Sequence, residues 1–206
     1  MGMRVWVHHQ GHWARGGSNF AYTRDSGDSL SRSSLTLSFT YKCEREGEVR
    51  FAAGPPLHLS ELYDYFFRAE RNLSGTFSYL RKRYGQSIAG LPLEYVEITA
   101  LPNEGVPLHR RKVVVVLART HPGETVGSWV QRGLLETLLS SSGSVLRSYF
   151  IFYIVPAVNP DGVVWGNSRS SLTGRDLNRQ WQQPDPTWHP EIFSLKGLLL
   201  KLRQHR

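Results

Sequence analysis

A strand, a helix and a second strand follow one another between residues 113 and 155, and this alternation constrains the fold more than any other feature. Residues 113–118, Val-Val-Val-Val-Leu-Ala, form an uninterrupted apolar run of the kind that is buried on both faces of a largely parallel sheet. Residues 123–139 carry apolar side chains at helical spacing, and residues 149–155 form a second apolar run. The sequence therefore predicts an α/β fold whose ligands gather at the ends of the strands.

The stretch before residue 106 is expected to be organised differently. Residues 1–34 are rich in Gly, Ser and Arg, a composition that favours a flexible arm. We expect a partial β-rich domain at 35–105 and the N-terminal part of the α/β domain at 106–206. The last expected element of that domain is a helix over residues 190–202.

Within the β-rich domain, apolar and polar residues alternate over 35–41, as they do in a half-buried strand. The Glu-Gly-Glu sequence at 46–48 predicts a hairpin turn into a second strand at 49–53. A helix is expected over residues 77–84 and a further strand over residues 93–99.

The formal charge of +8 restricts the partners that the chain could bind. It arises from 25 Lys and Arg residues against 17 Asp and Glu residues, and 20 of the basic residues are arginines, whose rigid fork suits carboxylates and phosphates. Three interpretations stay open: an acidic protein partner, a nucleic acid, or a composition with solvated arginines. No zinc finger, basic zipper or RNA-binding aromatic motif accompanies the basic residues, so nucleic acid is the weaker functional interpretation.

The cysteine content and the lengths of the apolar runs bear on the compartment. The single cysteine, Cys43, allows no internal disulfide and suits a reducing compartment. No apolar run approaches the roughly 20 residues that a membrane helix needs, and the N-terminus lacks the apolar core of a signal peptide. These features predict a soluble intracellular protein without a membrane partner.

Two side chains suited to metal binding flank the start of the predicted helix. His121 and Glu124 lie three residues apart across the turn that follows the first strand, and imidazole and carboxylate both bind zinc at about 2.0–2.2 Å. The spacing alone is a weak signal, because a loop histidine near a solvated glutamate in a first helical turn has the same pattern.

A second group of polar residues follows the second strand. Residues 159–162, Asn-Pro-Asp-Gly, are typical of a turn. Beyond them, Asn178 and Arg179 could hold a carboxylate, and the separate Arg169 could stabilise the negative oxygen that develops when a carbonyl is attacked. Taken singly, each arginine could equally be a solvated surface residue.

Four segments occur in a fixed order in the second half of the chain. They are His-Pro-Gly-Glu-Thr at 121–125, Asn-Pro-Asp-Gly-Val at 159–163, Gly-Asn at 166–167 with Arg169, and Leu-Thr-Gly-Arg-Asp-Leu-Asn-Arg at 172–179. In this order they resemble the zinc carboxypeptidases, and specifically the branch of cytosolic carboxypeptidases. The resemblance implies a mixed sheet with helices, as in zinc carboxypeptidases, preceded by a small β-rich domain.

The resemblance also implies a role for each candidate residue. His121 and Glu124 would be two of three protein ligands of one Zn²⁺ ion. Arg169 would polarise the scissile carbonyl and stabilise its oxyanion, while Asn178 and Arg179 would hold the terminal carboxylate of the substrate. In such enzymes a zinc-bound water, activated by a glutamate base, attacks the last peptide bond.

Members of this branch remove C-terminal glutamates, including those of the polyglutamate side chains of tubulin. The implied partners are therefore C-terminal or glutamylated acidic protein tails, tubulin among them. The implied location is the cytoplasm, in association with microtubules. A basic protein that meets an acidic tail is electrostatically sensible.

Two residues that the resemblance implies have no match in the chain. The third zinc ligand is a histidine in an Asp-x-His-Gly-His-like segment, and the catalytic glutamate comes later still, whereas the chain ends 27 residues after Arg179. Neither His189 nor His205 lies in such a segment. We therefore expect the N-terminal portion of a longer protein, inactive by itself. A non-catalytic module that binds acidic tails or C-termini is the alternative.

Overall fold

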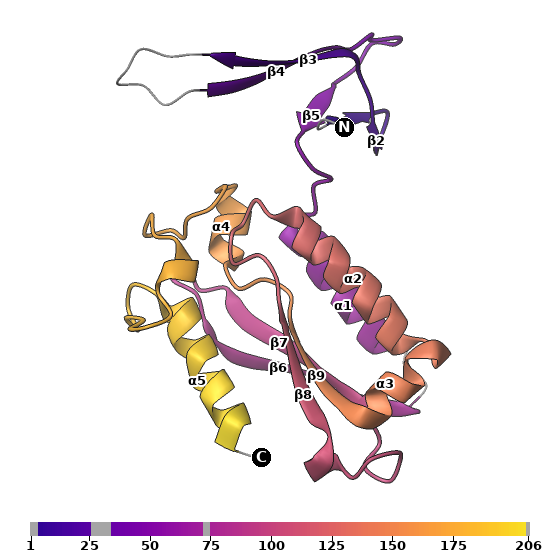
Figure 1. The fold of residues 1–206 in the computed structure, drawn as a ribbon, viewed down its shortest axis with the longest axis vertical. Helices are drawn as coiled ribbons and strands as arrows, with labels where there is room; N and C mark the ends of the chain where they lie inside the picture. The colour runs from indigo at the N-terminus through magenta and orange to yellow at the C-terminus, as the bar shows by residue number, and fades with distance from the viewer. Residues whose placement is uncertain (1–3, 26–33, 72–74, 205–206) are drawn as a thin grey trace. The chain divides into compact units, whose positions relative to one another are not determined.

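The computed structural model describes residues 4–25, 34–71 and 75–204, and the chain forms two compact units, Met1–Pro56 and Leu57–Arg206. Figure 1 labels the helices and strands of both units. This division differs from the predicted one, which placed boundaries after residues 34 and 105. The second of these boundaries falls inside the second unit, because strands on either side of it join one sheet.

The first unit is built from strands in its described residues. These are β1 (Trp6–His9), β2 (His12–Arg15), β3 (Ser18–Asp25), β4 (Ser34–Thr40) and β5 (Arg50–Ala52). They form an antiparallel sheet in the order β2-β1-β5 and a separate antiparallel pair, β3-β4. Three of these strands lie in the stretch predicted as a flexible arm, so the structure differs from the prediction there. These strands are short, and the Gly and Ser residues around them hide the alternation of apolar and polar residues by which a strand is predicted.

The hairpin predicted between residues 35–41 and 49–53 does not form, although both strands do. β4 pairs with β3, and β5 pairs with β1. Aromatic contacts accompany this pairing: Phe39 stacks on Phe20 with ring centroids 6.1 Å apart, and Phe51 meets Phe39 edge-on at 5.3 Å. Alternation of apolar residues identifies a strand but does not identify the strand that it pairs with. Side-chain packing of this kind decides the pairing.

The second unit contains a four-stranded mixed sheet in the order β6-β7-β9-β8. Its strands are β6 (Phe77–Gln86), β7 (Pro92–Ala100), β8 (Lys112–Leu117) and β9 (Phe150–Val155). β6 and β9 each run antiparallel to β7, and β8 runs parallel to β9. Helix α2 (Thr125–Leu139) lies between β8 and β9 in the chain, so the predicted strand–helix–strand unit of an α/β fold is confirmed.

Five α-helices and three short 3₁₀ turns complete the described part of this unit. They are α1 (Leu59–Arg71), η1 (Leu108–Arg110), α2 (Thr125–Leu139), η2 (Ser141–Gly143), α3 (Ser144–Tyr149), α4 (Pro160–Trp165), η3 (Leu177–Arg179) and α5 (Pro190–Gln204). No helix in the described residues has the length and apolar character needed to cross a bilayer.

The core of the second unit lies on both faces of the sheet, with α1 and α2 on one side and α5 on the other (Figure 1). Leu62 and Phe66 of α1 and Leu135 of α2 are buried against the first face. Ile192 and Leu195 of α5 are buried against the second. The sheet thus sits between two helical layers, which positions the loops at its strand ends.

The helix predicted over residues 77–84 is wrong, because this segment forms strand β6. Phe77 and Tyr79 point into the core in strand alternation. Charged residues further along β6 make cross-strand ion pairs with β7, among them Lys82 to Glu97 at 2.8 Å. The contacts across the sheet decide the structure here, because they stabilise this segment more than its local preference for a helix does.

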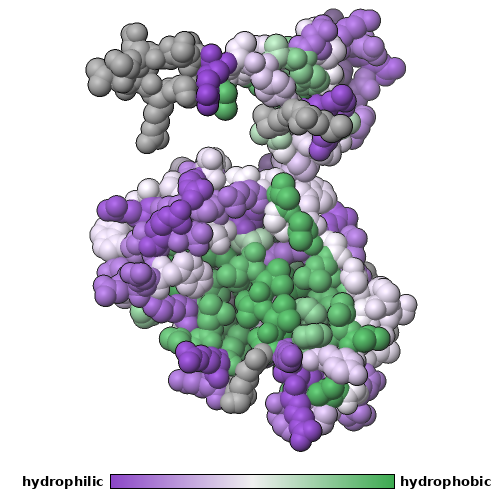
Figure 2. All heavy atoms as spheres, in the orientation of Figure 1, coloured by the Kyte–Doolittle hydropathy of each residue, from purple (hydrophilic) through white to green (hydrophobic). Residues whose placement is uncertain are grey.

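Strand β8 lies at the edge of the described sheet and is only half-buried, whereas the sequence predicted burial on both faces. The last four residues of the neighbouring β9 are buried. Figure 2 shows a continuous hydrophobic area on this side of the second unit. Val113, Val115 and Leu117 of β8 are half-buried and pack against the apolar cluster that contains Ile192 and Leu195 of α5. An edge strand keeps such side chains partly exposed.

Glu191, in the first turn of α5, is a buried carboxyl with an incomplete set of partners. It is 1% exposed, and its Oε2 atom has no hydrogen-bond partner among the described residues. Burial, and then the nearby Asp161 carboxylate, raise the pKa of Glu191 to about 7. Since an unfolded chain has a glutamate pKa of about 4.3, the folded protein binds more protons between these two values.

We expect Glu191→Gln to stabilise the protein at pH 8. The contribution of Glu191 to the free energy of unfolding is largest below about pH 4.3 and falls by about 3 kcal/mol as the pH rises to 7. Urea unfolding at pH 5 and pH 8 measures this slope. The exposed Glu46→Gln variant should keep the wild-type slope, and an unchanged slope in Glu191→Gln would contradict the expectation.

Candidate metal and carboxylate site

The candidate site lies where the parallel strands β8 and β9 end side by side. Pairing continues beyond the strands, because the Val158 amide donates to the Ala118 carbonyl at 2.9 Å and the Asn159 amide donates to the Arg119 carbonyl at 3.0 Å. The turn that carries His121 and the start of helix α4 at Asn159 are therefore held next to each other. This is the strand-end position that the α/β pattern predicted.

Arg119 shapes the turn between β8 and α2. Its φ of 55° is unusual for a residue with a side chain, and it reverses the chain directly after the strand. The buried side chain donates from Nε to the Pro122 carbonyl at 2.7 Å and from Nη1 to the Leu57 carbonyl at 3.1 Å. The sequence analysis gave Arg119 no role, since neither its backbone conformation nor these partners leaves a pattern in the sequence.

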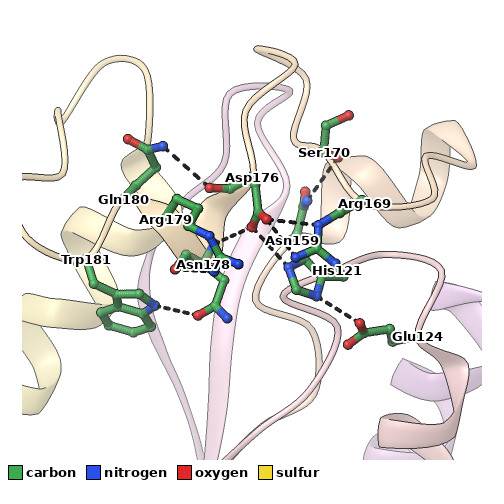
Figure 3. A network of polar contacts seen from close by, with 10 residues as sticks. All are labelled: His121, Glu124, Asn159, Arg169, Ser170, Asp176, Asn178, Arg179, Gln180 and Trp181. Atoms are coloured by element: carbon green, nitrogen blue, oxygen red, sulfur yellow. Dashed lines mark hydrogen bonds and ion pairs between the residues drawn. The ribbon is translucent and has the colours of Figure 1, made fainter. Parts of the chain in front are cut away.

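His121 connects two carboxylates across the site, as Figure 3 shows. Its Nδ1 lies 2.9 Å from Oε1 of Glu124, and its Nε2 lies 3.0 Å from Oδ1 of Asp176. The imidazole is largely buried, while the Glu124 side chain is 66% exposed. The predicted pair of His121 and Glu124 is thus brought together, with the carboxylate open to solvent.

Asp176 is a residue whose role the sequence analysis missed, although it stands inside the 172–179 segment. Its Oδ1 accepts from His121 Nε2 and from the Asn178 amide at 2.9 Å, and its Oδ2 accepts from Arg169 at 2.9 Å. Partial burial alone would raise the pKa of Asp176, but these hydrogen bonds outweigh it and hold the pKa below its ordinary value. Asp176 is therefore ionised and acts only as an acceptor.

This arrangement determines which nitrogen of His121 is available. Because the Asp176 carboxylate only accepts, Nε2 carries the proton that it donates. In the neutral ring Nδ1 then has a lone pair, and it faces the Glu124 oxygen 2.9 Å away. Two acceptors at this distance need a shared proton or a cation between them. Neighbouring ligands of tetrahedral zinc lie about 3.4 Å apart, slightly farther than these two atoms, and the exposed Glu124 side chain has room to move to that separation. With that small movement the two residues fit adjacent zinc ligands.

No third ligand joins this pair among the described residues. Residues 4–25, 34–71 and 75–204 contain no group of three His, Cys, Asp or Glu side chains placed to hold one ion. His189 uses its Nδ1 to accept from the Asp185 amide at 3.3 Å. His205 lies outside the described residues.

Asn178 and Arg179, the predicted carboxylate anchor, lie together in η3, directly after Asp176. Both side chains are exposed. The Oδ1 atom of Asn178 accepts from the indole Nε1 of Trp181 at 3.1 Å (Figure 3). Arg179 makes no ion pair within the described residues, so its guanidinium can bind an anion.

Arg169 is placed at the same site but is already paired. Its guanidinium bonds Asp176 through Nε and Nη2, and its side chain remains 52% exposed. The structure thus places His121, Arg169 and the Asn178 amide in contact with Asp176. Glu124 reaches the site through His121, and Arg179 follows Asn178 in η3.

Asn159 and Gly162 attach the second strand end to the His121 turn. The Asn-Pro-Asp-Gly segment, predicted as a turn, begins helix α4: Asn159 Oδ1 caps it by accepting from the Gly162 amide at 3.0 Å. Asn159 Nδ2 donates to the Ser170 carbonyl at 3.2 Å. Gly162 packs so closely on Pro122 that a Cβ would overlap the proline ring and would lie 2.8 Å from Asn159 Oδ1.

Comparison with known proteins agrees with this geometry. A family model described as zinc carboxypeptidase matches residues 71–193. Cytosolic carboxypeptidase 1 of Danio rerio is 36% identical in an alignment 208 residues long, which covers 93% of this chain and 18% of that protein. The human cytosolic carboxypeptidase 1 is 38% identical in an alignment 204 residues long, which covers 91% of this chain and 17% of that protein. The chain therefore spans less than a fifth of the length of these relatives.

The fold is also similar to that of solved structures. A metallo-carboxypeptidase from Burkholderia cenocepacia superposes with a TM-score of 0.77 at 22% identity, over 97% of this chain and 50% of that chain. At this identity the likeness concerns the fold alone. It agrees with the mixed sheet and helices predicted from the sequence.

We expect Gly162→Ala to destabilise the second unit by about 1–3 kcal/mol, because the new methyl group overlaps Pro122. Gly197→Ala in α5 is the matched control, since a Cβ there meets nothing within 4 Å, and alanine should stabilise the helix by about 0.5–1 kcal/mol. Urea unfolding measures both changes. Equal effects of the two substitutions would contradict the close packing of the strand-end turns.

Proposed function

The chain belongs to the zinc carboxypeptidase family, and on this basis we propose that it provides the zinc-binding turn and the carboxylate anchor of a metallocarboxypeptidase of the cytosolic type. The proposed reaction is hydrolysis of the last peptide bond of a protein tail, with glutamate as the residue removed. Glutamylated tails such as those of tubulin are the proposed substrates. The relatives named cytosolic carboxypeptidase support a cytoplasmic location for this protein. Its association with microtubules is part of the proposal that tubulin tails are its substrates.

The observation that carries the proposal is the set of bonds that Asp176 accepts. Through His121 it reaches the zinc-binding turn, and through Arg169 it reaches the residue proposed to act on the carbonyl. Through the Asn178 amide it fixes the turn that presents the carboxylate anchor. The groups proposed for metal binding, for carbonyl polarisation and for recognition of the terminus therefore all bond to one acceptor.

His121 and Glu124 would hold the zinc ion, which supplies Lewis acidity when bound. Asp176 keeps the His121 ring oriented with Nδ1 toward Glu124, as outer carboxylates do for zinc-binding histidines. Arg169 remains half exposed while it is paired, so it can donate to a carbonyl oxygen without leaving Asp176. These residues orient and stabilise groups of the substrate.

Asn178 and Arg179 would bind the free carboxylate at the end of the substrate. The guanidinium forms directed, charge-assisted hydrogen bonds with a carboxylate, and the amide adds further donors. Arg175 is also exposed nearby in sequence, and the chain carries a net charge of +8. Positive charge of this kind favours an acidic tail over a neutral one and speeds their encounter.

We expect Arg179→Ala to weaken binding of a peptide with a free C-terminus at least tenfold and to leave an amidated peptide nearly unaffected, since only the carboxylate uses the guanidinium. Isothermal titration of N-acetyl-Glu-Glu and its C-terminal amide measures this difference. Arg203→Ala, on the exposed last turn of α5, is the control for loss of one positive charge. Equal weakening of both ligands would remove the anchor role.

We expect the 206 residues by themselves to bind such peptides without releasing glutamate, because no third zinc ligand joins His121 and Glu124 in the described residues. Release of glutamate that a chelator abolishes would contradict this. The alternative, a non-catalytic module for acidic C-termini, rests on the same observation. Glutamate release by the protein isolated from its own cells, and its loss on His121→Ala, would favour the enzyme, whereas binding without release would favour the module.

A further inference from the structure

Trp181 is fixed in place two residues beyond the proposed carboxylate anchor. Its half-buried ring packs against the apolar cluster between the sheet and α5. Lys196 of α5 donates to the main-chain oxygens of Trp181 at 2.8 Å and Gln182 at 2.7 Å. Ring and backbone are therefore both held by the core side of the molecule, and the indole has little freedom to turn.

The indole N–H of Trp181 determines which way the Asn178 amide faces. An indole can only donate, so its partner across 3.1 Å must be the amide oxygen, Oδ1 (Figure 3). With the oxygen bound to Trp181, the remaining end of the amide is the NH₂ group, which has two donors and no acceptor. Arg179, the next residue, also offers donors only.

We propose that Trp181 is a positioning residue that turns Asn178 into a donor-only contact and so makes the anchor select a carboxylate over a carboxamide. This inference rests on the proposed function, in which Asn178 and Arg179 meet the end of the substrate. A carboxylate brings acceptors alone, so both of its oxygens can accept from these donors. A carboxamide brings an NH₂ group that finds no acceptor, and an unsatisfied polar group weakens binding.

Trp181→Phe tests the inference, because phenylalanine keeps an aromatic ring in the apolar cluster but has no N–H. Without the indole, Asn178 can rotate and offer its oxygen to an amide. We expect affinity for N-acetyl-Glu-Glu to fall about fivefold, the cost of ordering a free side chain, and affinity for its C-terminal amide to rise. Trp188→Phe is the matched control, since this exposed tryptophan lies outside the anchor.

A second measurement needs no ligand. In the wild-type chain, the Trp181 indole proton should exchange slowly with water, and Asn178→Ala should shift its NMR resonance and speed its exchange. The Trp188 indole resonance should not move. An unchanged Trp181 resonance in Asn178→Ala would overturn the inference, whether or not Trp181→Phe folds.

The remaining outcomes separate this inference from the proposed function. If the wild type prefers the acid over the amide and Trp181→Phe keeps that preference, the role of Trp181 is overturned and the proposed function stands. If the wild type shows no preference for the acid, the proposed anchor itself fails, and the role given to Trp181 fails with it. If the preference for the acid over the amide is lost in Trp181→Phe and kept in Trp188→Phe, the result supports both the role of Trp181 and the proposed anchor.

Discussion

The carboxylate of Asp176 is the interaction on which the site depends. It accepts from His121, from the Asn178 amide and from Arg169, which come from three separate segments of the chain. Charge-assisted bonds of this kind are stronger than bonds between neutral groups, and they also fix direction. One partly buried acid thus orients an imidazole, aligns a turn and retains a guanidinium. Replacing it would disturb all three groups together.

The sheet makes this convergence possible. β8 and β9 are parallel neighbours, so the segments that follow them leave at the same edge. The strained turn at Arg119 and the close packing of Gly162 on Pro122 hold those segments in contact. α5 contributes from the opposite side, since Ile192 and Leu195 pack on the sheet while Lys196 holds the Trp181 segment. The sheet and its helices therefore position the polar side chains of the site, which lie in the loops after the strands and not in the strands themselves.

The sequence predicted the elements whose signal is local and repeated. The apolar runs of β8 and β9 and the long helix between them were predicted correctly. The five candidate side chains lie near one another at the strand ends, but their roles stay predictions. The sequence could not reveal long-range choices: residues 77–84 have helical spacing but pair with β7, and β5 joins β1 instead of β4. Asp176 was missed for a related reason. Asp176 bonds to His121 and Arg169, which lie 55 and 7 positions earlier in the chain, and contacts at such separations leave no periodic pattern in the sequence.

The tautomer of His121 tests the central claim most directly, because the orientation of the site follows from it. Long-range ¹H–¹⁵N NMR of the 206-residue protein distinguishes the two ring nitrogens. The account predicts a protonated Nε2 in wild type, and a shift of the Nδ1 resonance when Zn²⁺ is added that is lost in Glu124→Gln. A proton on Nδ1 alone, or a ring that does not respond to Zn²⁺, would contradict it.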